Sequence, residues 1–585
     1  MPLARRPFVS LFVRSAGRRI ARTIAASLAI ATAVGGTISA ALLASPVAGG
    51  APAPRPATAS AATSTAGDGD VAPDTLPAVP PNIVVFLVDD MGWQDTSVPF
   101  GPDPTPLNAR YRTPAMQRLA GEGMRWTDAY ATPICSPSRI SMITGLNAAR
   151  HMVTSWTLRR GQSTDAKHPR LTFPAWNVNG LVPAEDAGPA IPRSVRASAL
   201  PARLRAAGYH TIHVGKAHFA AMDTPAADPT AIGFNVNIAG HAAGAPGSYH
   251  GEHHYAGGRR RGQPEQPSVW DVPGLADYHG TDVNLTEALT REAIAALRDA
   301  AMRDAPFFLH LSHYAVHTPI MPDARYVEAY DALDATEAAY ASMVEAMDRS
   351  LADVLAELDR LELASNTLVV FFSDNGGLSD HARGGERNTH NRPLSNGKGS
   401  AREGGSRVPM LVRWPGVVAA GSTTGEPMIA EDLFTTILAA AGASAADDDR
   451  IDGRDLGAVL RDAGASLGER PFVWHLPNMW AAKGPGYGPA SWIRLGDWKL
   501  IHYHDPEHAP RFELFNLTED LGETRSRARE QPEIAQRLAT ALTEALRARG
   551  AMRSIRRDTG EPVAWPDAGL AAWLDEAATR EPTAP

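Results

Sequence analysis

Two pairs of oxygen-bearing side chains lie directly after apolar runs of the sequence. Asp89 and Asp90 follow the run at 83–88, and Asp374 and Asn375 follow a second run. Such runs are typical of strands buried on both faces of a parallel sheet, and open α/β sheets bind ligands beyond the carboxyl ends of their strands. Either pair alone could be an ordinary turn. Together they predict one site of hard oxygen ligands suited to Ca²⁺ or Mg²⁺.

Cys135 is the only cysteine of the chain, so no intramolecular disulfide can form. A lone cysteine is commonly a buried structural thiol. Ser136 is a favourable N-cap and Pro137 a favourable first helical residue, so we expect a helix to begin here with Cys135 at its positive end. Arg139, four residues on, could fold back beside the thiol. The residues alone leave two interpretations open: a structural thiol, or a nucleophile in an oxyanion site.

Helical and strand patterns alternate around these residues. The expected helices cover 198–207 (with Ser198 as N-cap), 286–302 and 336–363, and the expected strands cover 83–88, 211–214, 307–311 and 367–372. This alternation predicts an α/β fold with a large mixed, mostly parallel sheet flanked by helices.

The pattern changes after residue 465. Short strands are expected at 491–494, 498–503 and 512–515, and a closing helix at 531–549. Strands joined by tight turns favour a smaller antiparallel sheet, here with one C-terminal helix.

Residues 135–145, Cys-Ser-Pro-Ser-Arg-Ile-Ser-Met-Ile-Thr-Gly, resemble the signature of the type I, formylglycine-dependent sulfatases. Other segments resemble further blocks of that family in the same order: 208–211, 215–218, 315–319, 373–377, 397–399, 403–409 and 514–517 with Asp520 and Glu523. The resemblance covers about 81 to 550. It implies an alkaline-phosphatase-like fold and the hydrolysis of sulfuric esters.

The resemblance also implies a cofactor chemistry. In that family a separate formylglycine-generating enzyme converts the cysteine, and the hydrated aldehyde attacks sulfur, after which its second hydroxyl expels sulfate. One divalent cation, most often Ca²⁺, polarises the sulfate. The implied cation ligands are Asp89, Asp90, the converted Cys135, Asp374 and Asn375.

Further catalytic roles are carried over in the same way. Arg139 and Lys216 would hold the hydrate, and His218 would be the base of the second step. Lys398 and His317 would contact the sulfate and protonate the leaving oxygen. His310 and His313 lie nearby, but only His317 fits the His-x-Pro spacing of the family.

The substrate is expected to be a sulfated carbohydrate, or another sulfated small molecule. Segments 233–241 and 247–249 resemble carbohydrate-sulfatase branches, and His241, Asn391 and His475 are the candidate substrate-binding residues. These three could equally be ordinary loop or core residues.

Two rival functions remain open. A phosphonate monoester or phosphodiester hydrolase of the same superfamily is disfavoured by the intact blocks around Lys216, His218 and Lys398. A non-catalytic protein that binds sulfated glycan is disfavoured by the complete catalytic set, because binding alone needs no nucleophile.

Composition and charge limit the classes of protein to which the chain could belong. The chain has 585 residues, of which 44% are hydrophobic and 21% charged, with a net charge of −8. Residues 1–48 carry six arginines and no acid, so the remainder is more acidic still. This excludes a general nucleic-acid binder.

The arrangement along the chain predicts an exported protein that is periplasmic, secreted or anchored to the cell envelope. The sequence of residues 1–48 is typical of a signal peptide or an N-terminal membrane anchor. Residues 49–80 are rich in Ala, Pro and Thr and are expected to form a disordered linker. A catalytic domain over 81–465, a C-terminal subdomain over 466–550 and an extension over 551–585 would follow.

Overall fold

The computed structural model describes residues 79–580 apart from 187, 258–266, 445–449, 481 and 483. The predicted leader, and the linker up to residue 78, lie outside the described residues. All described residues belong to one compact unit, Pro73–Pro585. Among the described helices, none has the length and apolar character needed to cross a bilayer.

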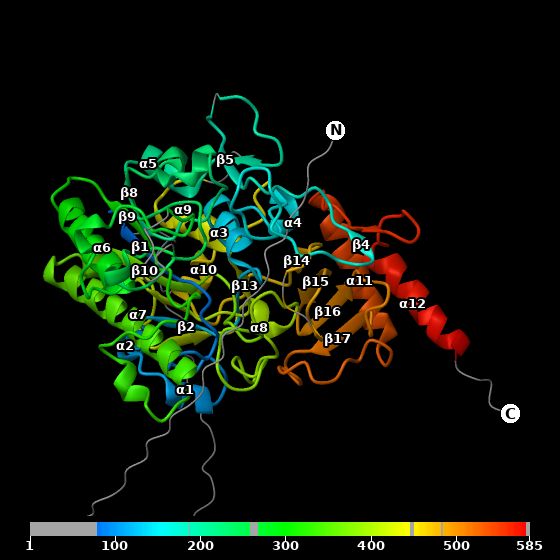
Figure 1. Cartoon of the computed structure of the whole chain (residues 1–585). Helices are drawn as coiled ribbons and strands as arrows, with labels where there is room; N and C mark the ends of the chain where they lie inside the picture. The colour runs from blue at the N-terminus through cyan, green and yellow to red at the C-terminus, as the bar shows by residue number, and fades with distance from the viewer. Residues whose placement is uncertain are drawn as a thin grey trace, which may run out of the picture. The chain divides into compact units, whose positions relative to one another are not determined.

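An eight-stranded mixed sheet forms the centre of this unit (Figure 1). Its strands, in spatial order, are β12 (Ser422–Thr424), β2 (Met124–Trp126), β11 (Met410–Arg413), β10 (Thr367–Ser373), β1 (Asn82–Val88), β9 (Phe307–Ser312), β7 (His210–Gly215) and β8 (Val236–Ile238). From β10 to β8 all neighbours are parallel, whereas β11 is antiparallel to both of its neighbours. The predicted fold class is confirmed.

Strand β1 is apolar throughout because both of its faces are buried. Val84, Phe86 and Val88 contribute to the core beneath α2 (Pro114–Glu122), α6 (Leu285–Ala301) and α7 (Ala335–Arg360). The alternate residues of the same strand pack beneath α3 (Cys135–Thr144), α5 (Leu200–Ala206) and α9 (Glu431–Ala440) on the opposite face. Successive side chains of a strand point to opposite faces, so one apolar strand supplies two cores.

The register of the sheet brings distant residues to one edge. Val88 of β1 lies opposite Ser373 of β10, and Leu87 lies opposite Ser312 of β9. Gly215 of β7 also lies opposite Ser312. The residues that follow these strands therefore emerge together at their carboxyl ends.

Two expected helix starts are corrected by the structure. The N-cap of α5 is Ala199 rather than Ser198, and it makes no side-chain cap. Helix α6 begins one residue earlier than expected because Asn284 caps it, its side chain accepting the N–H of Thr286. Asparagine at an N-cap satisfies an otherwise free helical N–H.

The C-terminal part is a four-stranded antiparallel sheet, as predicted. Its strands are β14 (Phe472–Leu476), β15 (Ala490–Leu495), β16 (Trp498–Tyr503) and β17 (Phe512–Asn516), and α11 (Pro532–Ala548) packs on them. The segment predicted as an extension is folded as well. Strand β18 (Ile555–Arg556) pairs with β4 (Leu171–Thr172), and α12 (Pro566–Arg580) contacts α11.

Candidate active site

Helix α3 begins at Cys135, one residue before the expected N-cap. Its N-cap is Ile134, so Cys135 is the first helical residue and Pro137 is the third. Ser136 does not cap the helix; its hydroxyl accepts the N–H of Thr157 at 3.2 Å. The thiol still lies at the positive end of the helix, as expected, and is only 3% exposed.

The imidazole of His218 faces the thiol. Its Nδ1 atom lies 3.4 Å from Cys135 Sγ, and its Nε2 atom lies 2.8 Å from the carbonyl oxygen of Thr157. A carbonyl only accepts, so Nε2 carries the proton and Nδ1 presents a lone pair to the sulfur. Burial and the nearby Lys216 hold the pKa of His218 well below its usual range, which keeps the ring neutral. Burial also raises the pKa of the Cys135 thiol.

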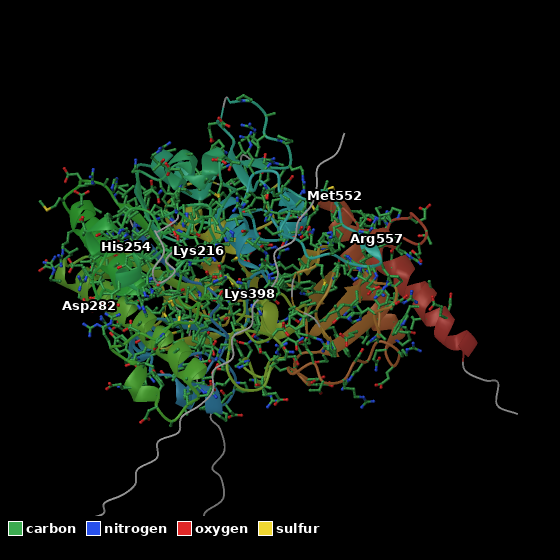
Figure 2. All side chains as sticks on the ribbon, viewed as in Figure 1. Lys216, His254, Asp282, Lys398, Met552 and Arg557 are labelled. Atoms are coloured by element: carbon green, nitrogen blue, oxygen red, sulfur yellow. The ribbon has the colours of Figure 1, made fainter. Side chains whose placement is uncertain are left out.

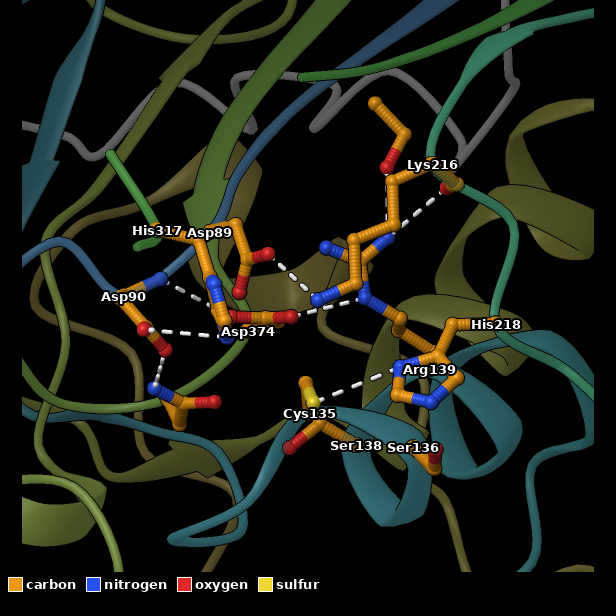
Figure 3. Close-up of polar contacts among 12 residues, drawn as sticks. Asp89, Asp90, Cys135, Ser136, Ser138, Arg139, Lys216, His218, His317 and Asp374 are labelled. Carbon is orange, nitrogen blue, oxygen red and sulfur yellow. Dashed lines mark hydrogen bonds and ion pairs between the residues drawn. The ribbon is translucent and has the colours of Figure 1, made fainter. Parts of the chain in front are cut away.

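The carboxylates lie on the other side of the sulfur (Figure 3). Asp89 and Asp90 follow β1, and Asp374 follows β10, as the register requires. Burial and the adjacent Asp374 raise the pKa of Asp89 well above its usual range. Burial opposes ionisation of Asp90 too, but Lys398 and His317 outweigh it and hold the pKa of Asp90 below its usual range.

Two buried lysines pair with these aspartates. Lys216, directly after β7, contacts Asp89, and Lys398, on the long loop between β10 and α8 (Glu403–Ser406), lies 2.5 Å from Asp90 Oδ1 (Figure 2). Burial disfavours the charge of Lys398, but Asp90 more than compensates and raises the pKa of this lysine. Removing either partner would leave a buried charge unpaired, which is costly.

Several oxygen atoms of this cluster have no hydrogen-bond partner among the described residues. They are Oδ1 of Asp89, Oδ2 of Asp90 and Oδ1 of Asn375, and all are buried. Single ligand atoms of Asp89, Asp90 and His317 lie within 4.8 Å of one another. Buried unpaired oxygens are unfavourable unless something binds them. Their number, charge and spacing fit a divalent cation with oxygen ligands.

Arg139 connects α3 to the strand ends. Its Nε donates to Asp374 at 2.7 Å, and its Nη1 donates to Ser312 Oγ at 2.6 Å and to the carbonyl of Lys216 at 2.9 Å. The side chain is fully buried, and its Nη2 has no partner within the described part of the chain. Arg139 thus fixes α3 against β10, β9 and β7 and retains one donor group.

The structure distinguishes His317 from the two histidines near it. His317 Nε2 lies 3.6 Å from Asp90 Oδ2. His310 instead contacts His213 at 2.9 Å, and His313 contacts Ser350 at 2.8 Å, both inside the core. The expected catalytic and cation-binding residues therefore all converge around Cys135.

The three candidate substrate residues do not line the cavity above Cys135. His475 is a correction: it is buried in β14, with Nδ1 bonded to Ser491 and Nε2 to the carbonyl of Met552, so both ring nitrogens are occupied. Asn391 donates to the carbonyls of Gly377 and Asn396, and so positions loops around the site. His241 contacts His218 only through its backbone carbonyl, which accepts the His218 N–H at 3.1 Å.

The cavity itself has a volume of about 680 Å³. Its floor includes Cys135, His218, His317 and Lys398, and its walls include Trp156, Trp270 and Trp480. Nothing in the sequence pointed to the three tryptophans. They belong to segments far apart in the sequence, and no local spacing links them.

Comparisons with known proteins agree with this geometry. The model of the family described as Sulfatase matches residues 81–443, which is more than half of the chain. The chain belongs to the sulfatase family. A second model, N-sulphoglucosamine sulphohydrolase, C-terminal, matches residues 398–549 of this sulfatase.

Individual relatives cover most of this sulfatase. N-acetylgalactosamine-6-sulfatase of Mus musculus is 31% identical over 72% of this chain and 74% of its own. A sulfatase of Formosa agariphila is 27% identical over 77% of this chain and 85% of its own. The solved structure of Ps i-CgsB in complex with k-i-k-neocarrahexaose shares the fold, with a TM-score of 0.63 and 24% identity over 86% of this chain and 98% of that one.

Proposed function

We propose that this sulfatase hydrolyses the sulfate ester of a carbohydrate, using a formylglycine made from Cys135 and one divalent cation, Ca²⁺ rather than Mg²⁺. One observation carries the proposal. The Sγ atom of Cys135 lies at a helix N-terminus between an unprotonated imidazole nitrogen and a set of unpaired carboxylate and amide oxygens. A nucleophile, a base and a cation cradle are thus in one place.

His218 is the base of this arrangement. Its Nδ1 lone pair faces position 135, so it can take a proton from a hydroxyl there, while the carbonyl of Thr157 fixes the ring. Arg139 retains its Nη2 donor for the group at position 135 or for a sulfate oxygen. Lys398 and His317, on the cavity floor, are positioned to bind the sulfate and to return a proton to the leaving alcohol.

Asp89, Asp90, Asp374, Asn375 and the oxygen at position 135 would hold the cation. When bound, it polarises the sulfate and lowers the pKa of the attacking hydroxyl. Ca²⁺ is favoured because it accepts several carboxylate and amide oxygens in flexible geometry, whereas Mg²⁺ keeps much of its water.

A carbohydrate substrate is supported by the relatives. The mouse relative is named N-acetylgalactosamine-6-sulfatase, and the solved structure of Ps i-CgsB is a complex with k-i-k-neocarrahexaose. The large cavity supports the same substrate class, since it has room for a sugar ring above the sulfate-binding floor.

We also propose export, with a formylglycine-generating enzyme as the partner during maturation. The support is the sequence of residues 1–48, with six arginines, no acid and a long apolar run, followed by a Pro- and Ala-rich segment. Comparing the N-terminal mass of the protein from cell and export fractions would test the location and leader cleavage together.

The deciding experiment combines two measurements on one sample. Protein from a host with a formylglycine-generating system is digested, the mass of the peptide around residue 135 is measured, and sulfate release is assayed on a panel of sulfated sugars. An aldehyde mass with sulfate release is the expected result. Two outcomes would contradict the proposal in protein that shows the aldehyde mass. One is turnover of phosphonate monoesters or phosphodiesters only, and the other is binding of a sulfated glycan without any turnover.

A further inference from the structure

The walls of the cavity above Cys135 differ in character from its floor. Trp156, Trp270 and Trp480 all line it, and all three are partly exposed. Five other tryptophans, by contrast, are completely enclosed in the cores: Trp93, Trp126, Trp176, Trp474 and Trp492. Partly exposed aromatic rings that face one cavity are typical of a ligand-binding wall.

Each of these tryptophans is linked, through the chain or through one contact, to a residue of the candidate site. Trp156 precedes Thr157, whose carbonyl binds the ring of His218. Trp480 lies against Gly399, next to Lys398: a Cβ at Gly399 would fall 2.0 Å from the Trp480 ring, and Gly399 has a φ of +82°. The close approach and the positive φ both require glycine there.

Trp270 is held through the loop that supports His218. Its carbonyl accepts the N–H of Gly247 at 2.7 Å. Three residues earlier in the same loop, Gly244 lies directly against His218, because a Cβ at Gly244 would fall 2.2 Å from the imidazole Cε1. The tryptophans are therefore placed at a set distance from the reacting centre.

Charge is almost absent from these walls. Among the described residues that line the cavity, Lys398 is the only lysine or arginine, and Asp90 already pairs with it. Apart from His381 and the hydroxyls of Thr164 and Thr318, a second sulfate or a carboxylate on the substrate would lose water against indole, proline, alanine and leucine surfaces, where the described residues offer no further lysine or arginine. The net negative charge of the chain would disfavour a polyanion further.

We infer that Trp156, Trp270 and Trp480 form a sugar-binding wall that selects a sugar carrying one sulfate and no second anionic group. The inference rests on the proposed function and narrows its substrate class. The C–H face of a pyranose stacks on indole, and Thr164 and Thr318 at the same cavity offer hydroxyl partners for the sugar. Arginines 259 to 261 fall outside the described residues.

The test begins with the wild-type, matured enzyme and needs no variant. Sulfated sugars are assayed in pairs, each monosulfated sugar against its own disulfated form, with aryl and steroid sulfates alongside. We expect kcat/KM to be about tenfold higher for the monosulfated member of the productive pair. Equal or better turnover of the disulfated form, or of an aryl or steroid sulfate, would overturn the inference.

Variants then assign the selection to the wall. Trp270→Ala and Trp156→Ala should raise KM about tenfold with kcat within about twofold, and Trp270→Phe should restore most of the loss. Trp565→Ala is the matched control, because Trp565 is partly buried but lies outside the cavity. Unchanged KM in the two cavity variants would overturn the inference. The inference would also be overturned if the preference for the monosulfated sugar disappeared when arginines 259 to 261 are replaced by glutamine.

A binding measurement separates this inference from the proposed function. The tryptophan fluorescence of Cys135→Ala is measured while the monosulfated sugar is added. Quenching in Cys135→Ala that is lost in Cys135→Ala/Trp270→Ala would support the wall, even if the matured enzyme releases no sulfate. Absence of quenching in Cys135→Ala would overturn the wall. Absence of sulfate release from aldehyde-containing protein would overturn only the reaction.

Discussion

The Nδ1 atom of His218 lies 3.4 Å from the Sγ atom of Cys135, while the opposite ring nitrogen is bonded to the carbonyl of Thr157. A hydroxyl in place of the sulfur would therefore meet a fixed acceptor. This relationship depends on the backbone around both residues, because α3 begins at Cys135 and the Gly244 loop packs against the imidazole.

Cys135→Ala should abolish sulfate release and leave the fold intact. The thiol is a small part of a buried cluster, so its loss should cost only about 1 kcal/mol of the free energy of unfolding. Sulfate release and the midpoint of thermal unfolding would be measured on the same preparation. Failure of the variant to accumulate as folded protein would instead favour a structural thiol.

Gly244→Ala should impair catalysis although it replaces no reacting group. The new methyl would fall 2.2 Å from Cε1 of His218, so the ring must move away from position 135. We expect kcat to fall by about tenfold or more, since a misplaced base loses much of its effect. Gly121→Ala, in α2 with open space around it, is the control and should retain full activity. Normal kcat in Gly244→Ala would show that the ring position is not important.

Cation binding should stabilise the protein as well as activate it. The charge of Asp374 opposes the ionisation of Asp89, and a bound cation would relieve that repulsion. Adding Ca²⁺ to chelator-treated protein should raise the midpoint of thermal unfolding with increasing concentration, because the folded state alone presents the cradle. Asn375→Ala, which removes an unpaired oxygen, should weaken that shift. An identical shift in wild type and Asn375→Ala would argue against the site.

Acid should destabilise the C-terminal sheet through His475. Burial lowers the pKa of His475 to about 4, whereas an unfolded histidine titrates near about 6.5. The unfolded state therefore binds more protons between these values, and the free energy of unfolding falls as the pH drops through them. By pH 5 the loss should reach about 2 kcal/mol.

The matching variant is His475→Gln, compared by denaturant unfolding at pH 7.5 and pH 5. It should be less stable than wild type at pH 7.5, because it loses a bond to Ser491 or Met552, but its stability should change less on acidification. His253→Gln, at an exposed position, is the control. An unchanged pH dependence in His475→Gln would rule out this role for His475.

The sequence predicted the sheet and the convergence of Asp89, Asp90 and Asp374 at its edge because both depend on short patterns. An apolar run followed by Asp89 and Asp90 is typical of a buried strand with the two aspartates at its carboxyl end. The parallel register of β1 and β10 then brings Asp374 beside them. Helix α3 begins two residues earlier than predicted, because a contact with Thr157 occupies the Ser136 hydroxyl that was expected to cap the helix.

The substrate wall could not be predicted in this way. Trp156, Trp270 and Trp480 come together only through tertiary packing, in which glycines at 247 and 399 allow close approach. For the same reason His475 was misassigned. A histidine beside an aromatic residue suggests a sugar contact, but the β14–β15 pairing turns it toward Ser491 and away from the cavity.

Glu403 of α8 links Tyr130 of β3 (Ala129–Tyr130) to the C-terminal sheet, and this has a consequence for protein engineering. It accepts hydrogen bonds from Tyr130 at 2.6 Å and from Lys499 of β16 at 2.8 Å, and Glu523 binds both its backbone N–H and that lysine. The C-terminal sheet is thus not an interchangeable module. A chimaera that takes this sheet from a relative would have to carry Glu403 with it, so the practical crossover point lies before α8 rather than near residue 466.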